Sequence, residues 1–357
     1  MSRFFTERLS ALTPYVPGEQ PRDRRYIKLN TNESPFPPSK KALEEAEKVL
    51  GTLNLYSDPD CKALRNELAG TYGVSPDEVL VSNGSDEVLN FAFQAFGDET
   101  HPVSFPDVTY GFYPVFAALN RIPYREIPLR EDFSIDPEDY YQAPGPVILA
   151  NPNAQTGVAL SRAEIEEIVK QNPDNVVVVD EAYVDFGGES AVPLTKQYEN
   201  LLVIMTFSKS RSLAGSRLGF AIGAPALIQD LNTVRCSTNP YNVNSVTLSL
   251  GIGALRDPEY MQKNAAYIAA LRETTKEALG ALGFTVTNSK ANFILARSDR
   301  IGGRELYLKL KERGILIRHF DTERLSDYNR ITIGSREQMQ VLLETIGILL
   351  RERSGAQ

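Results

Sequence analysis

The sequence predicts an α/β fold, in which a mostly parallel central sheet carries helices on both faces and a smaller α+β domain follows. Three observations support this prediction. From about residue 30 to residue 255, short apolar runs alternate with stretches of helical periodicity. Residues 176–179 are four consecutive valines, which is typical of a central parallel strand covered on both faces. After Pro258 the pattern changes to one long amphipathic helix and then mixed strands and helices.

The elements of the larger part follow from these runs in chain order. The first thirty residues carry Pro14, Pro17 and Pro21 and little periodicity, so we expect an irregular arm there that packs with the small domain. Strands are expected at residues 78–81, 102–105, 147–150, 176–179, 201–205 and 219–222. Helices are expected at residues 40–50, 62–72, 85–96 and 161–170.

The C-terminal part has a different pattern. A helix is expected from Pro258 to about Leu279, because Met261, Ala265, Ile268 and further apolar residues lie on one of its faces. Strands are then expected at residues 284–286, 292–296, 315–318 and 330–333, with helices at 304–312 and 336–351. We therefore predict three parts: an arm at 1–30, a large domain at 31–255 and a small domain at 256–357.

Composition excludes several classes of function. The net charge of −8 disfavours nucleic acid and anionic membranes as partners, and no apolar run approaches the roughly 18–20 residues of a membrane span. Cys61 and Cys236 match no metal-binding spacing, and His101 and His319 are too few for a histidine-based metal site. The N-terminus has the pattern of neither a signal peptide nor a transit peptide, so we expect a cytoplasmic protein without a metal.

The main candidate for chemistry is the segment at residues 206–220. Lys209 follows the apolar run 201–205, Thr206 and Ser208 supply hydroxyl groups beside it, and Arg217 comes eight positions later. Strand ends are where α/β proteins place reactive groups, and a lysine there suits Schiff-base chemistry. The hydroxyl groups and the arginine suit a phosphate, so the combination suggests pyridoxal phosphate. Taken alone, however, a lysine beside serines is more typical of a solvated loop.

Two further segments support the active-site interpretation. Asp180 ends the valine strand and can pair with a cationic ring nitrogen, although a lone aspartate at a strand end is more often a helix cap or a turn residue. Gly84 and Ser85 stand between an expected strand and an expected helix, where free backbone N–H groups bind phosphate. The alternative interpretation of this turn is a helix cap built on Ser85.

Three more segments have weaker signals. Residues 151–157 follow another strand end and taken singly are a turn, whereas residues 109–113 supply aromatic rings that can stack on a planar cofactor or belong to the core. Arg318 and Arg330 lie at expected strand ends of the small domain and could bind an anion, or be ordinary surface arginines. Most of these segments adjoin a strand end, and their joint occurrence favours one site.

Longer segments extend the pattern over nearly the whole chain. They are residues 12–19 (LTPYVPGE), 29–38 (LNTNESPFPP), 55–59 (LYSDP), 82–87 (SNGSDE), 180–183 (DEAY), 206–209 (TFSK) and 330–334 (RITIG). With these segments the chain resembles the fold-type I pyridoxal-phosphate enzymes of the aspartate aminotransferase superfamily, and within it the histidinol-phosphate aminotransferases. The first two segments are the most specific to that branch.

The resemblance implies a role for each matching residue. Lys209 would bind the cofactor covalently and move the substrate proton, Asp180 would pair with the ring nitrogen, and Tyr183 would bind the ring hydroxyl. Tyr15, Asn32, Arg318 and Arg330 would bind the substrate. The residues implied in cofactor binding are Tyr56, Gly84, Ser85, Asp86, Tyr110, Asn153, Asp180, Tyr183, Thr206, Ser208, Lys209 and Arg217. Because Tyr56 would reach the phosphate of the neighbouring subunit, the resemblance also implies a homodimer with shared sites.

One position departs from the family pattern. Where the family usually has Asn-Asn-Pro-Thr-Gly, this chain has Asn153, Ala154, Gln155, Thr156 and Gly157. Ala154 cannot make the bond to the ring hydroxyl that the resemblance assigns to the second asparagine. Either Asn153 replaces it or Tyr183 acts alone.

The resemblance implies transfer of an amino group from L-histidinol phosphate to 2-oxoglutarate, giving imidazole acetol phosphate and L-glutamate, in histidine biosynthesis. The alternatives of the same fold are an aromatic amino acid aminotransferase and a threonine-phosphate decarboxylase. An alternative from another class is a non-catalytic, DNA-binding regulator that holds the cofactor. The acidic net charge argues against that regulator.

Overall fold

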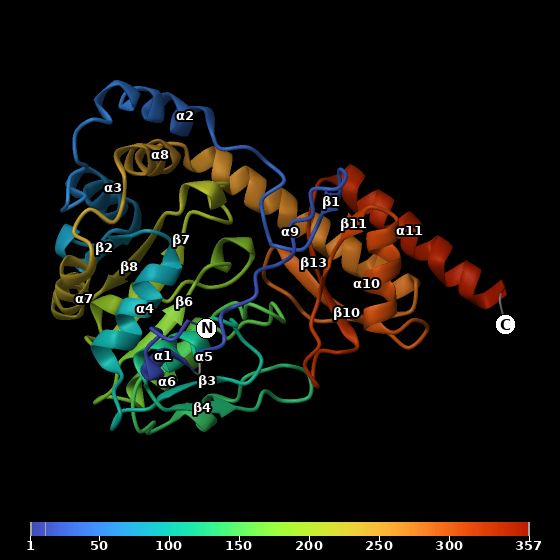
Figure 1. The fold of residues 1–357 in the computed structure, drawn as a ribbon, viewed down its shortest axis with the longest axis horizontal. Coiled ribbons are helices and arrows are strands. Elements are labelled where there is room, and N and C mark those ends of the chain that lie inside the picture. Colours follow the sequence, from blue (N-terminus) through green and yellow to red (C-terminus); the bar gives the residue numbers. More distant parts are fainter. Residues whose placement is uncertain (1, 11, 356–357) are drawn as a thin grey trace.

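The computed structural model describes residues 2–10 and 12–355 and consists of two packed bodies (Figure 1). The larger body is built on a seven-stranded sheet with the order β2-β8-β7-β6-β5-β3-β4. The pairs from β4 to β7 are parallel, whereas β8 runs antiparallel to both β7 and β2. The strands are β2 (Val79–Ser82), β3 (Val103–Pro106), β4 (Tyr124–Ile127), β5 (Val147–Ala150), β6 (Val177–Asp180), β7 (Leu201–Thr206) and β8 (Gly219–Gly223). The predicted mostly parallel sheet is confirmed.

The central strands are buried because both of their faces are covered. All four residues of β5 and of β6 are buried, as are all six residues of β7, and successive residues belong to different hydrophobic clusters. Val178 faces the cluster that also contains side chains of α4, α5 and α7, whereas Val177 and Val179 face the cluster that contains side chains of α3, α6 and α8. This alternation is the period of a β-strand, and it explains why the sequence shows a continuous apolar run.

Helices of the larger body lie on both sides of the sheet (Figure 1). The sequence predicted α2, α3, α4 and α6, but it did not identify α5, α7 or α8, nor the edge strand β4. The helices are α2 (Lys40–Glu47), α3 (Lys62–Tyr72), α4 (Ser85–Phe96), α5 (Tyr113–Asn120), α6 (Arg162–Lys170), α7 (Pro225–Thr238) and α8 (Ser245–Leu255). Short 3-10 turns occur at Leu50–Thr52, Pro76–Glu78, Pro137–Tyr140, Val184–Phe186, Val192–Lys196 and Ala214–Ser216.

The smaller body is built on an antiparallel sheet with the order β12-β13-β10-β9. The long helix α9 leads from the larger body along the smaller one, and α11 carries the chain to its C-terminal end (Figure 1). Its elements are α9 (Pro258–Ala281), β9 (Phe284–Val286), β10 (Phe293–Ser298), α10 (Gly303–Glu312), β11 (Ile315–Leu316), β12 (Arg318–His319), β13 (Tyr328–Thr332) and α11 (Arg336–Gly355).

The N-terminal segment is more regular than the sequence indicated. It contains a short helix, α1 (Glu7–Ser10), and a short strand, β1 (Ile27–Lys28), which pairs in parallel with β11 of the smaller body. Residues 315–318, expected as one strand, are divided between two partners, because β11 pairs with β1 whereas Arg318 and His319 pair with β13. Such pairing joins residues far apart in the chain, so local periodicity does not show it.

Several strands of the larger sheet end at one edge. The carboxyl ends of β2, β3, β5, β6 and β7 meet there, and β8 begins at the same edge because it runs in the opposite direction. Within residues 2–10 and 12–355, no cluster of His, Cys, Asp and Glu side chains could hold a metal ion, and no helix is both long and apolar enough to span a membrane. The shared edge of the sheet is therefore the place to look for a site.

Close packing of α2 on α8 provides a test of this architecture. A Cβ atom on Gly253 would lie 2.4 Å from the carbonyl oxygen of Lys41 and 2.6 Å from Cα of Ala42. We expect Gly253→Ala to lower the free energy of unfolding by about 1–3 kcal/mol, because the backbones of the two helices must move apart. Thermal unfolding measures this effect.

The matched control is Gly70→Ala in α3, where a Cβ atom would meet no heavy atom within 4 Å. This substitution should raise stability by about 0.5–1 kcal/mol, because alanine restricts the unfolded chain and favours the helix. Equal midpoints for the two variants would contradict the proposed packing of α2 against α8.

Candidate active site

A cavity of about 270 Å³ opens at the shared edge of the large sheet. We call it the central cavity. Its wall combines residues from the ends of β6 and β7, from the start of α4, from the loop before β8 and from the N-terminal segment. The lining residues are Thr31, Glu33, Ser85, Asp86, Tyr110, Ala154, Asp180, Ala182, Tyr183, Thr206, Ser208, Lys209, Ala214 and Arg217. The structure therefore brings together most of the residues that the sequence predicted as cofactor ligands.

One end of the central cavity is formed by the turn before α4. Gly84 has φ +80°, a conformation that favours glycine, and a Cβ atom there would lie 2.6 Å from Nη2 at the flexible end of the Arg217 side chain. Arg217 also pairs with Asp86, with Nη2 3.0 Å from Oδ2. The first N–H groups of α4 have no acceptor within the helix. Together with the Arg217 guanidinium, they form an end of the cavity suited to an anion.

The lysine enters the cavity beside two hydroxyl groups. Lys209 follows β7, and its Nζ donates a hydrogen bond to the carbonyl oxygen of Thr31 at 3.4 Å and lies 5.7 Å from the ring centre of Tyr183. Among the described residues it forms no ion pair. The Oγ1 of Thr206 donates to Oγ of Ser208 at 3.0 Å and accepts from the Ser208 backbone N–H at 3.1 Å. The amine is thus held by a neutral carbonyl and is free to react with a bound electrophile.

Asp180 places a carboxyl group in the wall of the central cavity. It ends β6, is 4% exposed, and accepts hydrogen bonds from the Tyr113 hydroxyl at 3.1 Å and from the Ala182 backbone N–H at 3.2 Å. Burial raises the pKa of Asp180 to about 6, and the two hydrogen bonds and Lys209 oppose that shift. A buried carboxyl group in this state is suited to bind a cationic partner, which would replace the lost solvation.

Tyr183 is held by a network from the N-terminal segment and the smaller body. Its hydroxyl accepts a hydrogen bond from Nδ2 of Asn32 at 3.0 Å. Asn32 is buried with φ +56°, and its Oδ1 accepts from the Thr332 hydroxyl at 3.1 Å. The carbonyl oxygen of Asn32 accepts from Nδ2 of Asn292 at 3.0 Å. Asn32 therefore orients a cavity tyrosine and links the two bodies.

Tyr110 forms another part of the wall. Its hydroxyl donates to Oδ1 of Asp86 at 2.7 Å. Burial, and then the Asp86 carboxylate, raise the pKa of Tyr110, so the hydroxyl remains a protonated donor over the physiological range. Its ring packs against the Tyr15 ring, with centroids 6.3 Å apart, and edge-on against Tyr113. The aromatic group is thereby fixed beside the cavity.

A second, larger pocket of about 680 Å³ adjoins this region, and the N-terminal segment, the larger body and the smaller body all line it. We call it the arm pocket. Tyr15, Gln155 and Arg318 are among its lining residues. Tyr15 stacks on Phe112 with ring centroids 4.2 Å apart, and Arg318 donates hydrogen bonds to the carbonyl oxygens of Val16 and Pro17 at 3.2 and 3.3 Å. The predicted substrate residues Tyr15 and Arg318 thus lie in a pocket separate from the central cavity.

Arg330 is a half-buried cation whose hydrogen-bond partners are neutral. Its Nη1 donates to the carbonyl oxygen of Ala154 at 2.7 Å and to Oε1 of Gln155 at 3.0 Å, whereas its buried Nε has no hydrogen-bond partner among the described residues. Burial lowers the pKa of Arg330, yet arginine stays charged in proteins. A guanidinium group with neutral partners and an unpaired donor keeps a positive charge that an anion can neutralise.

Five predicted residues line neither the central cavity nor the arm pocket: Asn32, Tyr56, Gly84, Asn153 and Arg330. Two of them, Asn153 and Tyr56, also lie away from the other site residues. The amide of Asn153 is used within its own loop, since Nδ2 donates to the carbonyl oxygen of Val108 and Oδ1 accepts from the N–H groups of Gln155 and Thr156. Tyr56 is 84% exposed and stacks on Tyr241 with ring centroids 4.6 Å apart. Within one chain, therefore, neither side chain reaches the central cavity.

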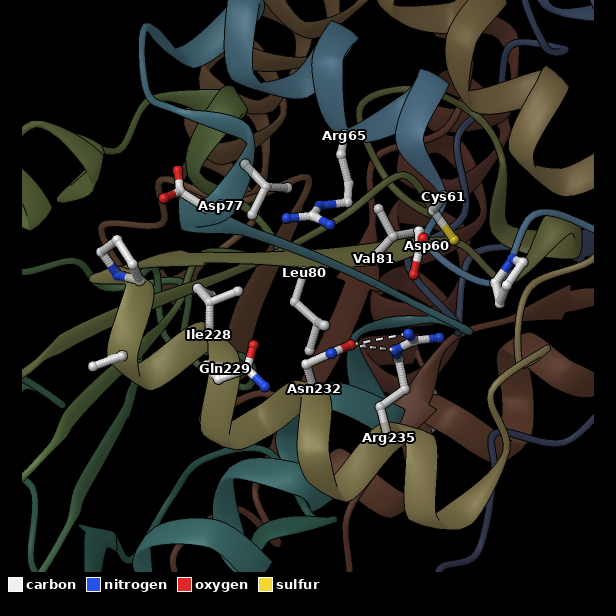
Figure 2. A pocket seen from close by; sticks show the side chains of 14 residues that line it. Asp60, Cys61, Arg65, Asp77, Leu80, Val81, Ile228, Gln229, Asn232 and Arg235 are labelled. Atoms are coloured by element: carbon white, nitrogen blue, oxygen red, sulfur yellow. Dashed lines mark hydrogen bonds between the residues drawn. The ribbon is translucent and has the colours of Figure 1, made fainter.

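A further pocket of about 450 Å³ lies at the free edge of β2, between α3 and α7 (Figure 2). Figure 2 shows Arg235 with two hydrogen bonds to Asn232, and its guanidinium also donates to the carbonyl oxygen of Pro240. Arg65 donates to the carbonyl oxygen of Pro76. None of the predicted site residues lines this pocket, and we assign it no chemistry.

Two contributors were not among the predicted site residues. In the sequence Tyr113 is only one member of an aromatic segment, although its hydroxyl donates to Asp180. Gln155 has only the signal of a departure from the family pattern, although its amide oxygen accepts from Arg330. Neither contact has a local sequence signal, because each joins residues more than sixty positions apart.

Comparison with known proteins agrees with this geometry. Residues 24–346 match the family model for class I and II aminotransferases. The chain is 45% identical to the histidinol-phosphate aminotransferase of Brachyspira hyodysenteriae over 355 residues, covering 98% of this chain and 100% of the relative. It is 48% identical to histidinol-phosphate aminotransferase 1 of Bordetella parapertussis over 347 residues, covering 96% and 98%.

A solved structure shows the same fold. The histidinol-phosphate aminotransferase of Sinorhizobium meliloti, in complex with pyridoxal-5'-phosphate, matches with a TM-score of 0.89 at 24% identity, covering 99% of each chain. At this level of identity the match supports the arrangement of the two bodies, whereas the curated relatives support the family.

The buried acid leads to a testable dependence on pH. Burial raises the pKa of Asp180 to about 6 from its ordinary value of 3.8, so the folded protein keeps a proton that the unfolded chain has lost between about pH 4 and 6. The stability that this proton contributes is present at low pH and is lost as the pH rises through about 6. Relative to the wild type, Asp180→Asn should therefore become more stable, by about 2–3 kcal/mol, between pH 4 and 7 in cofactor-free protein.

Thermal unfolding of both proteins across this pH range measures the difference between their free energies of unfolding. Groups that titrate in both proteins cancel in this difference. A difference that is constant with pH would show that Asp180 titrates as an exposed carboxyl group does.

Proposed function

The chain belongs to the class I and II aminotransferase family, and we propose that it transfers the amino group of L-histidinol phosphate to 2-oxoglutarate with pyridoxal 5'-phosphate as cofactor. One observation carries the proposal. Lys209, Asp180 and the Gly84 turn, which are far apart in the sequence, line one cavity of suitable size. In this reading the protein acts in histidine biosynthesis.

The residues present fit pyridoxal phosphate. The cavity offers an amine at Lys209 for the aldehyde and a buried carboxyl group at Asp180 for the pyridine nitrogen. Arg217, Ser85 and Ser208, with the Gly84 turn, supply positive charge, hydroxyl groups and backbone N–H groups for the phosphate. Gly84 supports this fit through its positive φ, which favours glycine, and through its closeness to the Arg217 guanidinium.

When bound, the cofactor supplies an electron sink for the negative charge that develops at the substrate Cα. The side chains of this protein do the rest. Asp180, as a carboxylate, would keep the ring nitrogen protonated. Lys209 would carry the proton from the substrate Cα to the cofactor C4′ in the first half-reaction and in the opposite direction in the second. Tyr183 would bind the ring hydroxyl, and Tyr110 would support the ring face.

Recognition of the ring hydroxyl would depend on Tyr183 alone. Ala154 lines the cavity but has no polar side chain, and the amide of Asn153 is engaged by its own loop. Asn32 then matters through Tyr183, because its Nδ2 donates to the tyrosine hydroxyl and so leaves the phenolic proton for the ring oxygen.

Substrate binding would use two cations. Arg330 has a buried Nε without a partner among the described residues, so we assign to it the carboxylate of 2-oxoglutarate or glutamate. Arg318 and Tyr15 line the arm pocket and would bind the distal phosphate of histidinol phosphate, or the second carboxylate of the oxo acid. One site would thus accept substrates that differ in their distal anion.

We further propose that the protein works as a cytoplasmic homodimer. Exposed apolar side chains gather between α2 and α3 and near Tyr241: Leu50 is 54% exposed, Leu53 54%, Leu55 66% and Tyr56 84%. A monomer would leave this patch in water, which is unfavourable. A partner chain that covers it would bring Tyr56 toward a second central cavity.

A half-reaction tests the proposed activity. Mixing the cofactor-loaded protein with histidinol phosphate, without an oxo acid, should convert the cofactor from its aldehyde to its amine form, which is followed by absorbance. We expect Lys209→Ala to lose this conversion by several orders of magnitude, because the proton at Cα then has no acceptor in the cavity. The exposed Lys40→Ala should behave as the wild type.

The same experiment separates the alternative activities. Faster conversion with phenylalanine than with histidinol phosphate would indicate an aromatic aminotransferase, and release of carbon dioxide from threonine phosphate would indicate the decarboxylase. Absence of conversion with every amine would exclude an aminotransferase.

Hybrid dimers test whether Tyr56 acts across an interface. A Lys209→Ala subunit paired with a Tyr56→Ala subunit has one site with both defects and one site with neither, if Tyr56 serves the partner's site. We expect refolded mixtures of the two inactive or weakened variants to regain up to about half of the wild-type activity per hybrid dimer. Activity no greater than the mean of the two parents would place Tyr56 in its own subunit's site or in none.

A further inference from the structure

Gln155 occupies a position between the two pockets. It lies in the turn at residues 154–156, lines the arm pocket, and its Oε1 accepts a hydrogen bond from Nη1 of Arg330 at 3.0 Å. The neighbouring residue Ala154 lines the central cavity, and its carbonyl oxygen accepts from the same Nη1 at 2.7 Å. The turn therefore binds one corner of the Arg330 guanidinium through two neutral acceptors.

The orientation of the Gln155 amide follows from its partner. A guanidinium group only donates hydrogen bonds, so the amide oxygen must face Arg330. The backbone N–H of Gln155 is itself fixed, because it donates to Oδ1 of Asn153 at 2.9 Å. Asn153, Gln155 and Arg330 thus form a continuous chain of hydrogen bonds from the loop of the larger body to β13 of the smaller one.

The Arg330 guanidinium group lies beside a second positive charge, so it needs hydrogen-bond acceptors to hold its position. Arg318 and Arg330 stand opposite each other on paired antiparallel strands, where side chains lie on the same face. Arg330 is also packed between aromatic rings, with Cζ 5.1 Å from the Phe293 ring centre and 5.5 Å from that of Phe320. Among the described residues no carboxylate pairs with it, and its Nε has no partner. Two like charges are therefore held together with acceptors that carry no charge.

We propose that Gln155 is a positioning residue that holds one corner of the Arg330 guanidinium group and leaves the rest of that group for the substrate carboxylate, and that its neutrality is what preserves this positive charge. The inference rests on the proposed function, in which Arg330 binds that carboxylate. A carboxylate at position 155 would make a stronger contact with Arg330 but would compete with the substrate for the same charge. A side chain without an acceptor would leave Nη1 with one partner and the guanidinium less well oriented.

Three substitutions distinguish this role from a merely structural one. The probe is glutarate, a dicarboxylate that cannot react, and its dissociation constant for the cofactor-loaded protein is measured by calorimetry. Gln155→Met should weaken glutarate binding roughly 3–10-fold, the loss of one hydrogen bond. Gln155→Glu should weaken it by at least about 30-fold while leaving the melting temperature equal to or above that of the wild type, because the protein gains an internal ion pair.

A merely structural role for Gln155 predicts the opposite order of glutarate affinities for these two variants. If the contact only stabilises the loop, Gln155→Glu preserves it and should bind glutarate better than Gln155→Met does. The matched control for the added negative charge is Gln197→Glu, at an exposed residue that lines neither pocket, and it should bind glutarate as the wild type does. Glutarate binding by Gln155→Glu that equals or exceeds that of Gln155→Met would overturn the proposal.

A further variant separates this inference from the proposed function. Arg330→Met should lose glutarate binding if Arg330 is the carboxylate site. If Arg330→Met binds as the wild type does, the proposed assignment of Arg330 fails, and the inference fails with it. If Arg330→Met loses binding but Gln155→Glu retains it, only the inference is wrong.

Discussion

The pairing of β2 with β8 is the constraint on which the candidate site depends. β8 is antiparallel to its neighbours, so Gly219 at its start lies beside Ser82 at the end of β2. A Cβ atom on Gly219 would lie 2.4 Å from the backbone nitrogen of Ser85, which shows how closely the two segments approach. This contact places Arg217 against the Gly84 turn and joins the lysine segment to the start of α4. A strand running in the other direction would carry Arg217 to the far edge of the sheet.

Around this edge the protein places charges in surroundings that do not neutralise them. Asp180 is buried among neutral hydrogen-bond donors, and burial raises its pKa to about 6. Arg330 is half-buried and has neutral acceptors. Each group is costly to bury alone and becomes favourable when a ligand of opposite charge arrives. A ligand of opposite charge removes this cost when it binds, so the cost adds to the binding free energy. This is a physical reason for the site to select a cofactor with a cationic ring and a substrate with a carboxylate.

The contacts that join the two bodies also orient residues of the candidate site. Asn32 belongs to the N-terminal segment, orients Tyr183 of the larger body, and is bound by Asn292 and Thr332 of the smaller one. The Asn153–Gln155–Arg330 chain makes a second connection between the bodies at the other side of the site. Both connections end on side chains that we assign to ligand binding. A change in the relative position of the bodies would therefore alter recognition of the cofactor and of the substrate together.

Much of the fold could be predicted from the sequence, because buried parallel strands and amphipathic helices have local periodicity. The strands at residues 147–150 and the helices at 62–72 and 85–96 coincide with β5, α3 and α4. The elements that were missed have weak local signals. The strand β4 is an exposed edge strand, α8 mixes hydroxyl and apolar residues without a clear amphipathic period, and β1 forms only through pairing with β11. Strand pairing and edge position depend on distant parts of the chain, so no local window contains them.

For the site, the sequence by itself determined which chemistry is available: Lys209 and Asp180 at strand ends, Gly84 before a helix, and arginines in the C-terminal part. Only the tertiary structure decided which of these residues meet. It gathers most of the cofactor residues around the central cavity, assigns Tyr15 and Arg318 to the arm pocket, and leaves Tyr56 on the surface. It also engages Asn153 within its loop and gives Gln155 a contact with Arg330. The physical reason is that residue types follow from the chain, whereas distances between side chains follow from how strands pair and how the two bodies pack.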